Sequence, residues 1–183
     1  SGTHQAEVAA GTQQHLDDDR RFHRCQAFVE ISSELSSAFR DMLPGNARFR
    51  PAFLGHVVTE LVLDRILILE DPVQLDRYYE VLQQVDPWEV QVAVNRMARG
   101  GTTQELALLI ERFCEVRFLD DYRTPEGLLY RLNQVLKRIK LAQLPDESVS
   151  VIRVADDLVA PRVNELLGWS PGGMSVEPAE KES

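Results

Sequence analysis

The segment from residue 52 to 69 constrains the fold more than any other part of the chain. Phe, Leu, Val and Ile occupy almost every side of its helical wheel, which is typical of a helix buried among other helices. Within it, His56, Glu60 and Asp64 follow one another at intervals of four residues, so on a helix they share one face with Thr59. Because burying charged groups without partners is costly, this stripe requires a metal ion, opposing charges or enclosed water.

A second ladder of the same kind lies nearer the amino terminus. His15, Asp19 and His23 are also spaced by four, in a segment without proline or internal glycine. Three of the four histidines of the chain therefore fall in the two ladders. Helix bundles build carboxylate–histidine metal sites from such inward-facing residues. Two helices packed face to face would bring up to six ligands together, and we take all six as candidate metal ligands: His15, Asp19, His23, His56, Glu60 and Asp64.

The rest of the chain predicts an all-α, single-domain bundle of about seven helices. Asp71-Pro72 and Asp86-Pro87 each read as a helix cap followed by proline at the first helical position, and no strand pattern is present. We expect a flexible lead-in at residues 1–9, a helical domain at 10–168 and a disordered tail at 169–183. The expected helices span residues 10–42, 51–69, 72–85, 87–99, 103–119, 125–143 and 148–167, with core stripes of Phe28, Ile31, Leu35 and Phe39 in the first and Leu128, Leu132, Val135 and Ile139 in the sixth.

Composition narrows the functional class. The chain has 183 residues and a formal net charge of −9, which argues against a nucleic-acid-binding protein. No apolar run approaches the roughly 20 residues of a membrane span, and no signal-peptide pattern opens the chain. Two cysteines in helical segments are expected to be reduced, as in a cytoplasmic protein. No nucleotide-binding, serine-hydrolase or zincin motif is present.

Short blocks around the ladders carry a family resemblance. Besides the ladders themselves, they comprise Ala10-Gly11, Leu63, Ile66-Leu67, the run from Gln74 to Val85, Phe118-Leu119, Tyr122-Arg123, Leu132-Asn133 and Arg138. Together they resemble the acyl carrier protein phosphodiesterase family, which is often grouped with the all-helical HD-type metal phosphohydrolases. The resemblance implies a hydrolase that uses a divalent metal such as Mn²⁺ to cleave a phosphodiester. It suggests acyl carrier protein or another phosphodiester as substrate.

The chain departs from that family at three ladder positions. His23 and Glu60 stand where the family has Asp, and His56 has no counterpart there. The chain opens Ser-Gly without an initiator Met and lacks the family's usual amino-terminal segment, as a fragment or truncated chain would. The replacements keep residue types that bind metals, so metal dependence is expected to carry over better than the particular substrate.

The residue types suggest roles in phosphodiester hydrolysis. A metal with mixed nitrogen and oxygen ligands, such as Mn²⁺, Fe²⁺ or Zn²⁺, lowers the pKa of bound water and neutralises charge on a phosphoryl oxygen. Glu60 and Asp64 are candidate catalytic carboxylates, and if one carboxylate is left unligated, Glu60 is favoured as the general base. Arg24 and Arg123 are candidate phosphate clamps. An acidic carrier protein would need a basic patch, which the arginines at 20–24 and 48–50 could provide.

A non-enzymatic protein is the alternative. In that interpretation the ladders form buried salt bridges and hydrogen bonds between helices, or bind a metal without catalysis. A pocket open to solvent and floored by the ladder residues would favour the enzyme. Apolar surroundings without a cleft would favour the structural role.

Overall fold

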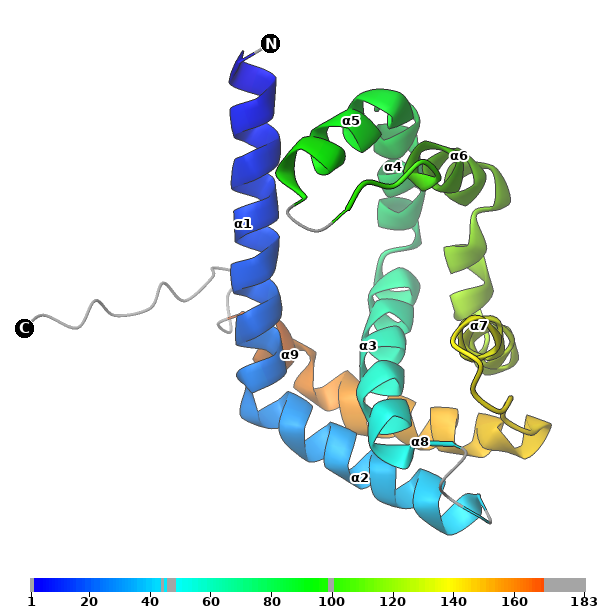
Figure 1. The fold of residues 1–183 in the computed structure, drawn as a ribbon. Helices are drawn as coiled ribbons and strands as arrows, with labels where there is room; N and C mark the ends of the chain where they lie inside the picture. Colours follow the sequence, from blue (N-terminus) through cyan, green and yellow to red (C-terminus); the bar gives the residue numbers. More distant parts are fainter. Residues whose placement is uncertain (1, 44, 46–48, 99–100, 170–183) are drawn as a thin grey trace, which may run out of the picture.

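The protein is built from α-helices and short 3₁₀ turns (Figure 1). The computed structural model describes residues 2–43, 45, 49–98 and 101–169, and no β-strand occurs in these ranges. The expected all-α fold is therefore confirmed. The elements are α1 (Gly2–Arg24), α2 (Gln26–Met42), α3 (Pro51–Glu70), α4 (Pro72–Gln83), α5 (Pro87–Met97), α6 (Leu106–Val116), η2 (Phe118–Arg123), α7 (Pro125–Arg138), η3 (Asp146–Ser148), α8 (Val149–Val159), η4 (Ala160–Arg162) and α9 (Val163–Leu167).

Helix α3 is the centre of the fold. It packs against α2, α8, η2 and α4, so apolar residues on most of its sides meet a neighbouring element. Its buried Leu54, Val58 and Val62 join the stripe of α2, whose four expected core residues are all buried. A smaller second core surrounds Tyr79 of α4, where the Tyr79 hydroxyl accepts a hydrogen bond from the backbone N–H of Leu119 at 3.2 Å.

Helices α2 and α3 approach each other closely at Gly55. A Cβ atom at this position would overlap the carbonyl oxygen of Ser32 and the side chain of Ser36. The Ser36 hydroxyl donates instead to the Ser32 carbonyl at 2.6 Å, and the Thr59 hydroxyl donates to the Gly55 carbonyl at 2.7 Å. Thr59, the uncharged member of the polar stripe, is therefore satisfied within the α2–α3 contact.

The first expected helix is divided in two. Cys25 adopts an extended conformation (φ −68°, ψ 149°) and its Sγ accepts from the backbone N–H of Phe28, so it caps α2 and ends α1. Residues 2–9, expected as a flexible lead-in, form the first turns of α1. Alanines and Glu7 favour a helix there, and no proline interrupts it.

Other differences concern helix ends. The expected helix 103–119 becomes α6 followed by the 3₁₀ turn η2, and Pro161 lies in the turn between α8 and α9. Helix α7 ends at Arg138, before the exposed Ile139. Within it Val135 is also exposed, because the helix is rotated so that Leu129 and Leu136 complete its buried face. The expected breaks at 43–46 and 100–101 lie partly outside the described residues. The expected tail at 169–183 lies outside them from residue 170 onward.

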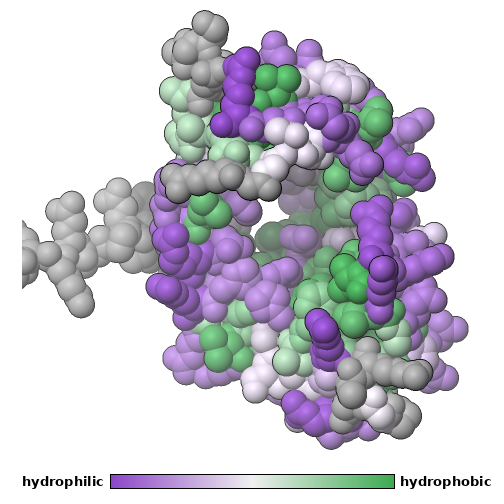
Figure 2. All heavy atoms as spheres, viewed as in Figure 1, coloured by the Kyte–Doolittle hydropathy of each residue, from purple (hydrophilic) through white to green (hydrophobic). Residues whose placement is uncertain are grey.

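The arrangement leaves an open space between α1 and α3 (Figure 1). The same face is hollowed at its centre in the space-filling view, with hydrophilic side chains along the α1 side (Figure 2). Side chains of α1, α3 and α9 line a hollow of about 1040 Å³ there, hereafter the acidic hollow. In the described part of the chain, no helix has the length and apolar character needed to cross a membrane.

Candidate metal centre

Three ladder residues meet where the end of α1 reaches α3. His23 Nε2 lies 2.8 Å from Glu60 Oε1, and His56 Nε2 lies 3.1 Å from the same oxygen. The two imidazole rings stack with centroids 4.7 Å apart and planes 16° from parallel. One potential ligand atom of each of the three residues lies within 4.8 Å of the others. These residues form the His–His–Glu cluster.

Phe28 fixes the orientation of both histidines. Its buried ring stands edge-on to His23 and to His56, with centroids 4.8 Å from each. Phe22 packs against Phe28 and His23 in turn. The break at Cys25 makes this possible, because it turns α1 away from α2 and leaves the last turn of α1 against α3. The ladder spacing alone did not identify Phe28.

Asp19 contacts the other nitrogen of His23. Its Oδ1 lies 3.3 Å from His23 Nδ1, while His23 Nε2 faces Glu60. A carboxylate on the outer ring nitrogen is the usual partner of a metal-binding histidine, since it fixes the tautomer and the ring orientation. The arrangement favours Asp19 as an outer partner of the cluster.

The two carboxylates raise the pKa of His23. Burial on its own lowers this pKa, but the hydrogen bond to Glu60 and the negative charges of Asp19 and Glu60 outweigh it. The metal-free cluster therefore favours a protonated His23. A metal ion must displace that proton, so its binding should weaken as the pH falls.

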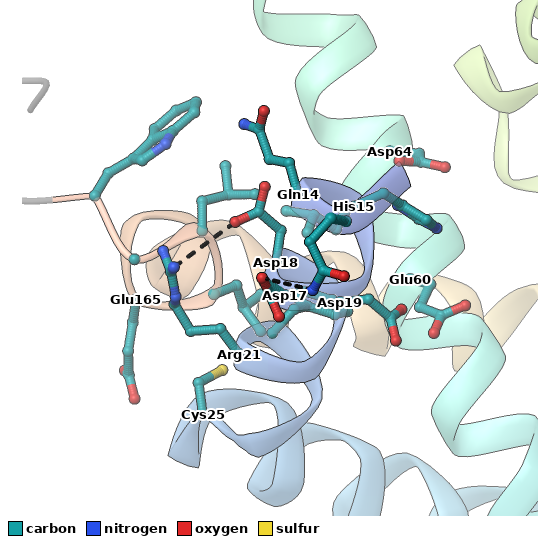
Figure 3. A pocket seen from close by; sticks show the side chains of 17 residues that line it. Gln14, His15, Asp17, Asp18, Asp19, Arg21, Cys25, Glu60, Asp64 and Glu165 are labelled. Atoms are coloured by element: carbon teal, nitrogen blue, oxygen red, sulfur yellow. Dashed lines mark hydrogen bonds and ion pairs between the residues drawn. The ribbon is translucent and has the colours of Figure 1, made fainter. Parts of the chain in front are cut away.

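His15 and Asp64 lie farther along the same two helices. The ladders run in opposite directions, and His15 and Asp19 extend from α1 toward Asp64 and Glu60 on α3 (Figure 3). All four line the acidic hollow, and no direct contact joins His15 or Asp64 to the cluster among the interactions of the described residues. Of the six predicted ligands, three form the cluster, Asp19 is its outer partner, and Asp64 lies beside it on α3 in the wall of the hollow. The sixth, His15, lies across the hollow.

Asp64 has an unusual environment for a carboxylate. Surrounding protein and the charge of Glu60 raise its pKa to about 6. Its side chain is nonetheless reached by solvent, because it stands at the wall of an open concavity. Access to water lowers the cost of ionising this carboxyl.

The two predicted phosphate clamps line neither of the openings beside the cluster. Arg24 is exposed at the end of α1 and lines neither the acidic hollow nor the opening described below. Arg123 lies on η2, where its guanidinium pairs with Asp120 at 3.3 Å. Arg20 pairs with Asp17 at 2.8 Å, which offsets part of the positive charge expected at residues 20–24.

A second opening, on the α2 side of the cluster, was missed from sequence. His23 and His56 line it together with residues of α2, and its volume is about 490 Å³. We call it the serine–arginine groove, after Ser32, Ser33, Ser36, Ser37 and Arg40. The two Ser-Ser pairs, spaced by four on an amphipathic helix, were the signal available in the sequence.

The donor set fits a divalent metal ion. Two imidazole nitrogens and one carboxylate are the ligands of many catalytic zinc sites, and they also suit Fe²⁺ and Mn²⁺. Ligands of a tetrahedral site at about 2.0–2.1 Å from the metal lie about 3.3 Å apart, close to the spacings around Glu60 Oε1. Three protein ligands would leave coordination positions for water or substrate.

Comparison with known proteins does not identify a family for the chain. No protein-family model, curated protein or solved structure matches the chain. The cluster and the two openings beside it are therefore the features that indicate a function.

Proposed function

We propose that the protein is a metal-dependent phosphodiesterase centred on the His–His–Glu cluster. The observation that carries the proposal is the convergence of His23 and His56 on one oxygen of Glu60, at the edge of an open hollow. Such a cluster supplies three ligands without closing the site. Mn²⁺, Fe²⁺ and Zn²⁺ are the metals that suit it.

The positions of the side chains suggest a different role for each of them in the reaction. What a divalent cation supplies in such a site is a more acidic bound water and neutralised charge on a phosphoryl oxygen. His23, His56 and Glu60 would hold the cation, and Asp19 would orient His23. Asp64, one helical turn beyond Glu60, is a carboxylate left to orient water or accept its proton.

The substrate proposed is a phosphodiester. The resemblance to acyl carrier protein phosphodiesterases suggests acyl carrier protein, or another phosphodiester, as its source. The acidic hollow repels anions unless a cation is bound, so the proposal makes metal loading a condition for substrate binding at that side. A requirement for metal is therefore the sharpest consequence of the geometry.

A structural polar network is the second candidate. It is favoured by the hydrogen bonding of His23, whose two ring nitrogens both face carboxylates. In that case the cluster joins α1 to α3 and no metal is needed. The protein would then bind no metal at stoichiometric level and would hydrolyse no phosphodiester.

Hydrolysis of bis(p-nitrophenyl) phosphate tests the proposal. The protein is stripped with a chelator and reloaded separately with Mn²⁺, Fe²⁺ or Zn²⁺. We expect activity with at least one of these metals and its loss in His56→Ala and Glu60→Gln. Arg153→Gln is the matched control, because Arg153 makes only an exposed pair with Glu126 on the described surface. Equal activity in His56→Ala, or none with any metal, would overturn the proposal.

A further inference from the structure

The His–His–Glu cluster separates two openings of different charge. The acidic hollow on one side is lined by six carboxylates, two of them Glu60 and Asp64, and by one arginine, Arg21. The serine–arginine groove on the other side has no carboxylate among its described lining residues and contains Arg40. His23 and His56 line the groove directly. An anion approaching the cluster therefore meets less repulsion from the groove than from the hollow.

Hydrogen-bond donors lie along the groove. Ser32 and Ser36 form its floor, where Ser32 Oγ lies 3.2 Å from Thr59 Oγ1 and Ser36 donates to the Ser32 carbonyl. Ser33 and Ser37 are exposed one position farther along α2, and Arg40 follows at the next turn. The Arg40 Nη1 donates to Ser37 Oγ at 3.4 Å, which places the guanidinium beside the Ser37 hydroxyl.

This combination suits a phosphoryl group. Guanidinium and hydroxyl groups are recurrent donors to phosphate oxygens, and the guanidinium fork carries five N–H donors. The two histidines of the proposed metal site line the same groove, so an anion held in it shares one opening with the position where chemistry is proposed. Apolar Val29, Phe28 and Ala52 complete the described walls.

We propose that the serine–arginine groove is the phosphoryl-binding subsite, with Ser33, Ser37 and Arg40 as the residues that hold the anion. The proposal rests on the proposed function for its role in the reaction, but the binding of an anion does not depend on it. In this proposal the two faces of the cluster have different roles. The phosphoryl group enters by the groove, and the carboxylates of the hollow balance the charge of the cation. Arg24 and Arg123 have no part in this subsite.

Calorimetric titration with phenylphosphonate tests the subsite. The full chain is titrated twice, once after chelator treatment and once loaded with Zn²⁺. We expect Arg40→Gln to weaken phenylphosphonate binding at least about tenfold in both states, because a charge-assisted hydrogen bond is lost. Ser33→Ala combined with Ser37→Ala should weaken it by a smaller factor. Zn²⁺ affinity should stay within about twofold in both variants, since neither removes a ligand.

A control in the hollow separates the two faces. Asp18→Asn removes one negative charge from the hollow wall and leaves the groove unchanged. The subsite assignment predicts the same phenylphosphonate affinity as wild type, whereas entry through the hollow predicts tighter binding. Circular dichroism confirms that each variant is folded, as expected for exposed positions on α1 and α2.

The outcomes distinguish the subsite from the proposed function. Groove-dependent phenylphosphonate binding in a protein that binds none of Mn²⁺, Fe²⁺ and Zn²⁺ would support the subsite and contradict the metal-dependent function. Zn²⁺ binding with no phenylphosphonate binding, or with binding that Arg40→Gln leaves unchanged, would overturn the subsite and leave the metal centre standing.

Discussion

Asp19 acts on His23 through the ring nitrogen that faces away from Glu60. Its Oδ1 is 3.3 Å from His23 Nδ1, so it holds the imidazole with Nε2 directed into the cluster. From the four-residue spacing alone, Asp19 was a candidate metal ligand like the other ladder residues. Its distance from His23 separates an outer partner from the three residues that meet at Glu60.

Asp19→Asn should weaken metal binding about 10- to 100-fold without abolishing it, because loss of an outer carboxylate costs that much in comparable sites. Competition with a chromophoric chelator measures the dissociation constant. Asp18→Asn is the matched control, since Asp18 lies on the same helix and pairs with Arg21 at 3.8 Å. Equal losses in the two variants would contradict a specific role for Asp19.

Asp64 should reduce stability at neutral pH when no metal is bound. Its pKa rises from 3.8 to about 6 on folding, so its contribution to stability is fully present below pH 3.8 and is lost as the pH rises through about 6. Asparagine does not ionise, so Asp64→Asn removes this pH-dependent loss of stability. Metal-free Asp64→Asn should therefore unfold at a higher temperature than wild type at pH 7.5, by about 2–4 °C for an effect of about 1 kcal/mol.

Thermal unfolding at several pH values checks this sign. The advantage of Asp64→Asn should shrink as the pH falls from 6 toward 3.8, because the wild-type carboxyl then binds its proton in both states. An advantage that grows on acidification would show that the Asp64 carboxylate is stabilised in the fold instead.

At the scale of elements, the contact between α2 and α3 depends on Gly55. Gly55→Ala places a methyl group against the Ser32 backbone, which cannot move without separating the helices. We expect a loss of about 2 kcal/mol or more in the free energy of unfolding, despite the better helix propensity of alanine. Urea denaturation measures it.

Gly11→Ala is the matched control for that substitution. Gly11 is also helical, but a Cβ there has no neighbour within 4 Å. Alanine should therefore leave stability unchanged or raise it by up to about 1 kcal/mol. Similar losses in both variants would show that the α2–α3 approach is not the cause.

The sequence predicted most elements because their signals are local. The Asp71-Pro72 and Asp86-Pro87 caps mark the starts of α4 and α5, and both aspartates accept backbone hydrogen bonds as expected. The division at Cys25 was not predicted, because cysteine is a rare helix cap and apolar periodicity continues through it. Val135 was misplaced because the rotation of α7 depends on its neighbours.

Part of the candidate site was also predictable. Four-residue spacing places each ladder on one face of its helix, and the two faces do meet across α1 and α3 (Figure 3). Spacing does not determine which turns touch. The turn at Cys25 brings only the end of α1 against α3, so His23 joins the cluster while His15 lies across the hollow.

At the scale of the whole molecule, α1 is held mainly at its carboxyl end. Phe22 and His23 pack against the core, whereas side chains between residues 9 and 16 are exposed. A metal bound by His23, His56 and Glu60 would tie α1 to α3. Hydrogen exchange should then slow at residues 19–24 on metal loading, while residues 6–14 continue to exchange rapidly. Protection that is unchanged by metal would contradict this link.

The most direct test of the central claim is the metal content of the purified protein after reconstitution, compared with that of His56→Ala and Glu60→Gln. The metal centre predicts near-stoichiometric Mn, Fe or Zn in wild type and a clear loss in both folded variants. Wild-type protein that retains no metal after reconstitution, or folded variants that retain as much as wild type, would show that the His–His–Glu cluster is a polar contact between helices.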